Sequence, residues 1–173
     1  YVKEGFYLAT VDFEIQPVNE TEVDVWFTID EKSKIKIREV QFIGNKAISD
    51  AELRGNMENR AADALSILND SGTFNQEAFD RDLERLVGVY WDKGYAAVKV
   101  ATPQVRLSRD KKFMYLAVPI DEGPIFTIDK VGFKGDLLGD TAEQMKKLRA
   151  KAGDRFSRTA IALDRERLSA YYQ

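Results

Sequence analysis

Apolar and polar positions alternate along residues 9–15 and again along residues 23–29. A period of two is typical of a strand with one buried face. The stretch between them, from Pro17 to Glu20, has the composition of a turn. We therefore predict a β-hairpin with one buried face. Its apolar positions are Ala9, Val11, Phe13, Ile15, Val23, Val25, Phe27 and Ile29.

The strongest helical pattern follows Asn75, a residue type that caps helices. Phe74 and Phe79 stand around it at the spacing of a hydrophobic staple. Gly94 is suited to end this helix, and Gly5 gives the same signal for the end of an earlier one. The predicted helix has an apolar face of Phe79, Leu83, Leu86 and Tyr90 and a polar side of Arg81, Asp82, Glu84 and Arg85.

Two capping boxes predict two further helix starts, one from Ser49 to Glu52 and one from Thr141 to Gln144. The stretch from 60 to 72 has no regular pattern. Its apolar positions indicate a further helical turn or two, through Ala61, Ala64, Leu65 and Leu68.

Three more strands are predicted, along residues 35–42, 95–107 and 114–120. The apolar phase of the first breaks between Ile37 and Val40, which indicates a bulge or a change of face. The phase of the second shifts at Pro103, and a proline, which has no N–H to donate, belongs on an edge strand or in a bulge. Pro119 falls in the strand that we expect to be central, so either it lies near the end of that strand or the register of the strand is shifted by one residue.

The strand and helix at residues 35–53, IKIREVQFIGNKAISDAEL, return 91 residues later as FTIDKVGFKGDLLGDTAEQM at residues 126–145. The pair Asp30–Glu31 before the first returns as Asp121–Glu122 before the second. A period of this length is that of a small domain. Each unit reads as strand, helix, helix, strand, strand. We predict an α+β fold of tandem units, each with a three-stranded mixed sheet covered by two helices.

The order of these motifs resembles the POTRA domain, the periplasmic module of the Omp85 family of outer-membrane assembly factors. The residues that carry the resemblance are IREVQFIGNKA at 37–47, WDKGY at 91–95 and VRLSRDKKFMYLAVPIDEGPIFTIDKVGF at 105–133. The last of these resembles the junction between the third and fourth POTRA domains. The resemblance implies that residues 1–32 are the C-terminal part of POTRA 2 (a helix end and a β-hairpin). It likewise implies that residues 33–123 are a complete POTRA 3, and residues 124–173 the N-terminal part (strand, helix, helix) of POTRA 4.

The resemblance also implies a role. In this family the domains form a non-catalytic scaffold on the periplasmic face of the Gram-negative outer membrane. They receive unfolded outer-membrane proteins and dock accessory lipoproteins, and they precede a C-terminal membrane barrel that these 173 residues do not include. The alternative is the POTRA region of a two-partner secretion transporter or of another envelope protein.

The composition excludes several kinds of chemistry. The chain has no histidine and no cysteine, so disulfides and cysteine-ligated zinc are excluded and its serines lack the commonest general base. The net charge is −3 with both signs interleaved, and we expect no nucleic-acid binding. We interpret the recurring carboxylate pairs at Asp30–Glu31 and Asp121–Glu122 as solvated turns. We expect no enzyme activity, metal or cofactor; a small α+β enzyme, which would need a pocket with convergent polar groups, is the remote alternative.

The candidate binding surface is the predicted strand at residues 95–107. The next strand must pair both with it and with the first strand, which places it at the edge of the sheet. An exposed edge offers unpaired N–H and C=O groups to an extended peptide. The alternative is an ordinary edge protected by Lys99, Pro103 and Arg106. The candidate residues are Tyr95, Ala96, Ala97, Val98, Lys99, Val100, Ala101, Thr102, Gln104, Val105, Arg106 and Leu107.

A second hypothesis concerns the two end units. The hairpin near the N-terminus and residues 124–173 are complementary parts of one domain type, and we expect each to expose an apolar face. Monomers rarely tolerate such faces. We therefore expect another copy of the chain to cover them, by heterologous strand exchange.

Overall fold

The computed structural model describes residues 1–62, 71–136 and 138–172, so the predicted helical turns around Ala64, Leu65 and Leu68 lie outside the described residues. The chain divides into two compact units. The first comprises Tyr1–Gln41, Met57–Asp82 and Pro103–Val118, and the second Phe42–Asn56, Leu83–Thr102 and Pro119–Gln173. The elements are η1 (Val2–Glu4), β1 (Thr10–Pro17), β2 (Val23–Asp30), β3 (Lys36–Ile43), α1 (Asp50–Gly55), α2 (Gln76–Asp92), β4 (Lys99–Val100), β5 (Gln104–Leu107), β6 (Phe113–Asp121), α3 (Thr141–Lys147) and α4 (Arg158–Tyr172).

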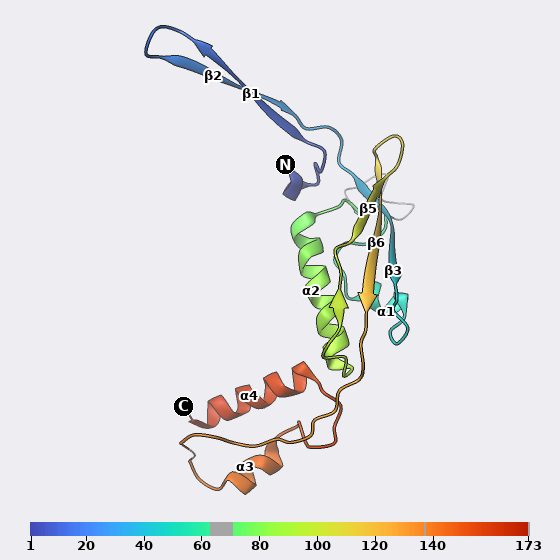
Figure 1. Ribbon diagram of the computed structural model, residues 1–173, viewed down its shortest axis with the longest axis vertical. Coiled ribbons are helices and arrows are strands. Elements are labelled where there is room, and N and C mark those ends of the chain that lie inside the picture. Colours follow the sequence, from blue (N-terminus) through green and yellow to red (C-terminus); the bar gives the residue numbers. More distant parts are fainter. Residues whose placement is uncertain (63–70, 137, 173) are drawn as a thin grey trace. The chain divides into compact units, whose positions relative to one another are not determined.

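The predicted α+β fold is confirmed, with β6 as the central strand of its sheet. The strand order is β3-β6-β4, and β5 also pairs with β6 (Figure 1). The predicted alternation along β6 is confirmed, because every second residue is buried. These inward side chains are Met114, Leu116, Val118 and Ile120, none more than 6% exposed.

The single strand predicted for residues 95–107 is instead two short strands separated by a bulge. Val100 lies opposite Ile120 and Gln104 opposite Ala117, so the β4–β5 side has one more intervening residue than β6. The N–H of Ala101 donates to the carbonyl of Pro119 at 3.0 Å. Pro119 has no N–H with which to return that bond, and Pro103 has none either. The two prolines explain both the break in the strand and the predicted shift of apolar phase.

The predicted features of α2 are confirmed, except for the position of one aspartate. Asn75 caps the helix by accepting the N–H of Ala78 at 2.8 Å, and the rings of Phe74 and Phe79 lie 5.6 Å apart. Asp82, which we predicted on the polar side, is fully buried.

The buried carboxylate of Asp82, on α2, binds the loop after α1. It accepts the backbone N–H groups of Glu58 and Asn59 at 2.7 and 2.9 Å, and the side-chain amide of Asn59 at 3.0 Å. We assigned Asp82 to the polar side of the helix because its side chain is charged. A carboxylate that accepts several hydrogen bonds can nevertheless be buried.

The predicted hairpin of β1 and β2 is confirmed, with Phe13 opposite Phe27. Its expected buried face is not covered, because every residue of both strands is exposed. The apolar side chains on that face are between 47% and 67% exposed, namely Val11, Phe13, Ile15, Val23, Val25, Phe27 and Ile29.

Two expectations for the C-terminal part are wrong. The cap of α3 is Asp140, whose carboxylate accepts the N–H of Ala142 at 2.8 Å, and Thr141 is the first helical residue. The strand expected at the start of residues 124–173 does not form; among residues 126–133 only Thr127 makes an isolated bridge, with Arg155. A strand is defined by its partner, and no described strand lies against this segment as β6 lies against β3.

The chain enters each repeat through the same backbone contact. The predicted glycine ends are confirmed by positive φ angles, +93° at Gly5 and +96° at Gly94. The carbonyl of Gly5 accepts the N–H of Ile35 at 3.3 Å, and the carbonyl of Gly94 accepts the N–H of Phe126 at 2.8 Å. The end of one helix is therefore bonded to the start of the next repeat at both joints.

Candidate functional site

The candidate edge residues occupy three different kinds of structure. Residues 95–98 form no strand, and the ring of Tyr95 packs edge-on against Tyr90 with centroids 5.8 Å apart. Lys99 and Val100 form β4, residues 101–103 form the bulge, and β5 follows. In the described residues, β4 and β5 pair with β6 and with no other strand.

The outward backbone groups of β5 can be assigned from its pairing. Ser108 donates its N–H to the carbonyl of Phe113 at 2.9 Å. In an antiparallel ladder, residues alternate between bonding the partner strand and pointing their N–H and C=O away from it. Arg106 and Gln104 therefore face β6. The N–H and C=O of Val105 and Leu107 point away from it, as an added strand requires.

Charged side chains flank this edge. Lys99 and Arg106 are exposed, and the guanidinium of Arg106 lies 6.0 Å from the ring centre of Tyr115 on β6. Charges and prolines at an edge restrict uncontrolled pairing. The edge thus has short strands and partial protection, and its open stretch is centred on β5.

Glu122, in the second of the two acidic pairs, has a structural role that sequence reasoning missed. One oxygen of Glu122 accepts the backbone N–H groups of Lys46 and Ala47, each at 2.8 Å, and the hydroxyl of Tyr90 at 3.0 Å. Burial, followed by the hydrogen bond and the charge of Glu122, raises the pKa of Tyr90 well above its ordinary value of 10.0. Glu122 therefore holds the loop after β3 to the end of α2; it is not a solvated turn residue.

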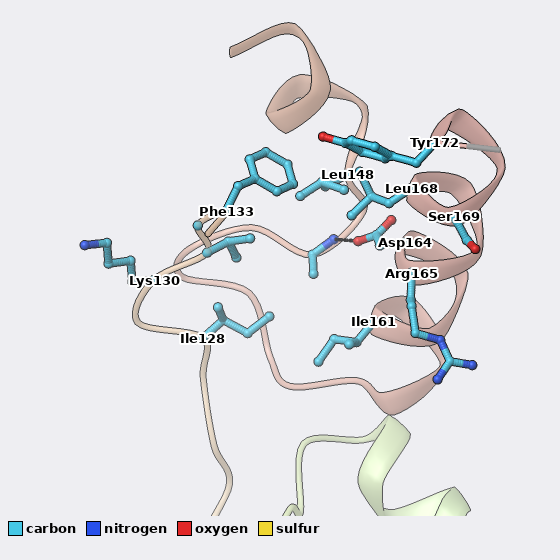
Figure 2. A pocket seen from close by; sticks show the side chains of 13 residues that line it. Ile128, Lys130, Phe133, Leu148, Ile161, Asp164, Arg165, Leu168, Ser169 and Tyr172 are labelled. Atoms are coloured by element: carbon cyan, nitrogen blue, oxygen red, sulfur yellow. Dashed lines mark hydrogen bonds between the residues drawn. The ribbon is translucent and has the colours of Figure 1, made fainter. Parts of the chain in front are cut away.

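A second surface is an open apolar groove of about 600 Å³ in the C-terminal part. Figure 2 shows Phe133 and Leu148 facing Leu168 and Tyr172, whereas Lys130 points away. The residues that line it come from the segment after Gly123, from the loop after α3 and from one side of α4. They are Ile128, Lys130, Val131, Gly132, Phe133, Leu148, Ala150, Ile161, Asp164, Arg165, Leu168, Ser169 and Tyr172.

The polar group in this groove is already satisfied. Asp164 is 5% exposed and accepts the N–H of Arg149 at 2.8 Å. It also accepts the N–H of Ala150 at 2.8 Å, the bond that is dashed in Figure 2. It repeats the role of Asp82, which lies 82 residues earlier in the preceding repeat. That recurrence was the signal in the sequence that could have identified both buried aspartates. Its carboxylate serves the fold, and most of the other residues that line the groove are apolar, apart from Lys130, Arg165 and Ser169.

The described residues contain no group of three or more His, Cys, Asp or Glu side chains that could hold a metal ion. None of the described helices combines the length and the hydrophobicity needed to cross a membrane.

Comparison with known proteins identifies the repeated unit. A family model named POTRA, described as a surface antigen variable number repeat, matches residues 35–123. The outer membrane protein assembly factor BamA of Nitratidesulfovibrio vulgaris is 28% identical over 178 residues, which cover 99% of this chain and 22% of that protein. The factor of the same name from Neisseria meningitidis is 27% identical over 148 residues, 86% of this chain and 19% of that protein. The chain thus spans about a fifth of the length of these relatives.

A solved structure has the same fold. The crystal structure of Haemophilus influenzae BamA POTRA3-5 matches 99% of this chain and 65% of its own, with a TM-score of 0.62 and 20% sequence identity. The resemblance drawn from the motifs is confirmed. Since the family model covers just over half of the 173 residues, the chain belongs to the POTRA family.

Proposed function

We propose that this chain is part of a non-catalytic scaffold that assembles β-barrel proteins at the periplasmic face of the outer membrane. It would receive unfolded outer-membrane proteins and dock accessory lipoproteins by β-strand addition. The similarity to proteins named outer membrane protein assembly factor supports a role in the assembly of outer-membrane proteins. The outward N–H and C=O groups of Val105 and Leu107, on a strand that pairs on one side among the described residues, support the mode of binding.

Backbone recognition suits a receiver of many clients. Hydrogen bonds to an edge read the peptide backbone, which all clients share, and side chains adjust the preference. The bulge and the exposed charges of Lys99 and Arg106 limit how much of the edge is open. We therefore place the binding stretch on β5 and regard residues 95–98 as support for it.

The experiment is a titration of the chain with an extended peptide from an outer-membrane protein, followed by amide chemical shifts and hydrogen exchange. The amides of Val105 and Leu107 should shift most and gain protection. The helices should change little. Shifts concentrated on α2 or α4, or no protection at β5, would contradict the proposal.

A matched pair of variants separates backbone pairing from side-chain contact. Val105→Pro removes the outward N–H and leaves the bonds to β6 in place, because proline is tolerated where the N–H faces solvent. Val105→Thr keeps that N–H. The proline variant should lose the peptide-induced shifts and the threonine variant should keep them. Equal binding by both would assign the binding to side-chain contacts and contradict backbone pairing at β5.

The proposed domain boundaries can be tested separately. Residues 33–123 are proposed as a complete unit between parts of two others, 1–32 and 124–173. A fragment of residues 33–123 should unfold in one cooperative transition. A fragment that shows no cooperative unfolding would place the boundaries elsewhere.

A further inference from the structure

We propose that the edge at β5 selects extended segments in which acidic side chains alternate with apolar ones. This inference rests on strand addition at β5, the proposed function, and adds the chemistry of the segment that the edge takes. The acidic side chains of the added strand lie beside Arg106, and its apolar side chains lie beside Val105 and Leu107. Arg106 is then the residue that determines the charge preference of the edge.

One face of the edge is apolar. Residues directly opposite each other in an antiparallel pair place their side chains on the same face of the sheet. Val105 lies opposite Leu116, which is 1% exposed. Leu107 lies opposite Met114, which is 0% exposed. Both therefore belong to the buried face, although Val105 itself is 41% exposed. Apolar surface at the rim of the core is thus open to an apolar side chain of an added strand.

The other face of the edge is positively charged at Arg106. This exposed residue lies opposite Tyr115, which alternates with the buried residues of β6 and so belongs to the outer face. The guanidinium stays over that face, 6.0 Å from the ring centre of Tyr115. The positions beside Arg106 on this face hold no charged residue. They are Gln104, Phe113, Tyr115 and Ala117.

The charge of Arg106 is less balanced than that of Lys99. Lys99 lies opposite an acidic residue, Asp121, and on the other side of the bulge from β5. Residues 95–109 contain three basic residues and no acidic one, in a chain whose net charge is −3. Opposite charges directly across two strands stabilise their pairing, and like charges destabilise it. The edge therefore favours an acidic residue beside Arg106 and disfavours a basic one.

The pairing pattern brings the added strand closest at this position. The outward N–H and C=O groups of Val105 and Leu107 bond the added strand, so Arg106 between them forms a non-hydrogen-bonded pair in an antiparallel addition. The Cα atoms of such a pair are about 4.5 Å apart, the shorter of the two spacings in the ladder. The residues on either side of that position face Val105 and Leu107. An alternating segment thus matches both faces at once.

The test compares three extended peptides of equal length, each titrated into the whole chain. In the first, valine alternates with glutamate. In the second, valine alternates with lysine. The third has the composition of the first, with its valines and glutamates in separate blocks. The shifts and protection of the Val105 and Leu107 amides report binding at β5. The glutamate peptide should bind about fivefold more tightly than the lysine peptide, and more tightly than the block peptide.

Two variants with the same net charge separate a local preference from an overall one. Arg106→Glu should reverse the order, so that the lysine peptide binds more tightly than the glutamate peptide. Arg38→Glu is the matched control, because the guanidinium of Arg38 is also exposed and lies 5.6 Å from the ring centre of Phe113. Arg38 is on β3, two strand spacings or about 10 Å from β5, and its variant should keep the preference of the parent.

The outcomes distinguish this inference from strand addition itself. Protection of β5 by the glutamate and lysine peptides with equal affinity would overturn the charge preference and leave strand addition standing. Loss of the preference in both variants would assign it to the overall charge of the chain and overturn the role of Arg106. No protection of β5 by any of the peptides would overturn strand addition and the charge preference together.

Discussion

The carboxylate of Asp92, the last residue of α2, accepts the backbone N–H of Thr159 at 2.8 Å and the hydroxyl of Thr159 at 2.7 Å. The end of one helix therefore caps the beginning of α4, in addition to the local cap by Ser157, which accepts the N–H of Ala160 at 3.2 Å. Arg158 adds a contact, with its guanidinium 4.9 Å from the ring centre of Trp91.

The joint between η1 and α2, in the preceding repeat, makes the same connection with different groups. There the side-chain amide of Asn75 donates to the carbonyl of Lys3 at 2.5 Å, and Lys3 pairs with Glu77 at 2.5 Å. The repeat preserves the place of the contact between a helix end and the next helix start, while the residues that make it have changed.

We predict that Asp92→Ala loosens the N-terminus of α4. Loss of a helix cap costs about 1 kcal/mol. Hydrogen exchange of the amides of Thr159 and Ala160 should accelerate accordingly, while that of β6 stays unchanged. Asp129→Ala, at an exposed position, is the control and should change neither. Faster exchange throughout the chain would contradict a local cap.

The same contact predicts a pH dependence. Partial burial works to raise the pKa of Asp92, but the hydrogen bonds from Thr159 and Ser157 and the charge of Arg158 outweigh it and hold the pKa below its ordinary value of 3.8. A lowered pKa in the folded state means that the stabilisation is complete above pH 3.8 and is lost as the pH falls through the folded-state value. As the pH is lowered, the protection of the α4 amides from hydrogen exchange should fall less steeply in the Asp92→Asn variant than in the parent. Identical acid profiles would contradict this assignment.

We predict that Asp82→Ala destabilises the fold strongly. The substitution leaves the N–H groups of Glu58 and Asn59 in a buried place without their acceptor, at a cost of about 3 kcal/mol. Urea unfolding should report a lower midpoint. Asp80→Ala on the exposed side of the same helix is the control and should stay within about 0.5 kcal/mol of the parent.

The glycine pair Gly44 and Gly135 separates backbone strain from steric overlap. Alanine at either position must adopt a positive φ, which costs about 1 kcal/mol. At Gly44 it must also displace the carbonyl of Ile120, and the total should reach about 3 kcal/mol. Thermal unfolding of Gly44→Ala and Gly135→Ala gives the comparison. Equal losses would mean that the close approach at Gly44 contributes nothing.

Tyr90→Phe should remove the hydrogen bond to Glu122 and, with it, part of the loss of stability at alkaline pH. Loss of one hydrogen bond costs about 1 kcal/mol near neutral pH. Because folding raises the pKa of Tyr90, its stabilisation is complete below pH 10.0 and is lost as the pH rises above that value. Stability measured by urea unfolding should therefore fall less steeply above pH 10.0 in the variant than in the parent. A parallel fall would contradict this prediction.

Local patterns predicted the elements that depend on neighbouring residues. The hairpin, the alternation along β6 and the staple of Phe74 and Phe79 each follow from spacing within one element. The cap of α3 was misplaced because Thr141 completes a capping-box pattern, whereas the preceding Asp140 is an equally good cap.

Contacts between segments that are distant in the sequence could not be predicted from such local patterns. The burial of Asp82 depends on the loop at Glu58 and Asn59, more than twenty residues away. The break at residues 101–103 depends on Pro119 in another strand. The order of strands in the sheet was predicted correctly, with the candidate strand at its edge. The length of that strand could not be predicted, because it depends on how Pro103 and Pro119 lie relative to each other across two strands.

The bulge also limits the length of strand that the proposed addition at β5 can pair. Before the bulge interrupts it, a paired strand meets the outward groups of only two residues, Val105 and Leu107. Two N–H and two C=O groups at about 1 kcal/mol each correspond to a dissociation constant of about 1 mM. In the proposed strand addition, a segment held this weakly would leave quickly and free the edge for the next segment of the client.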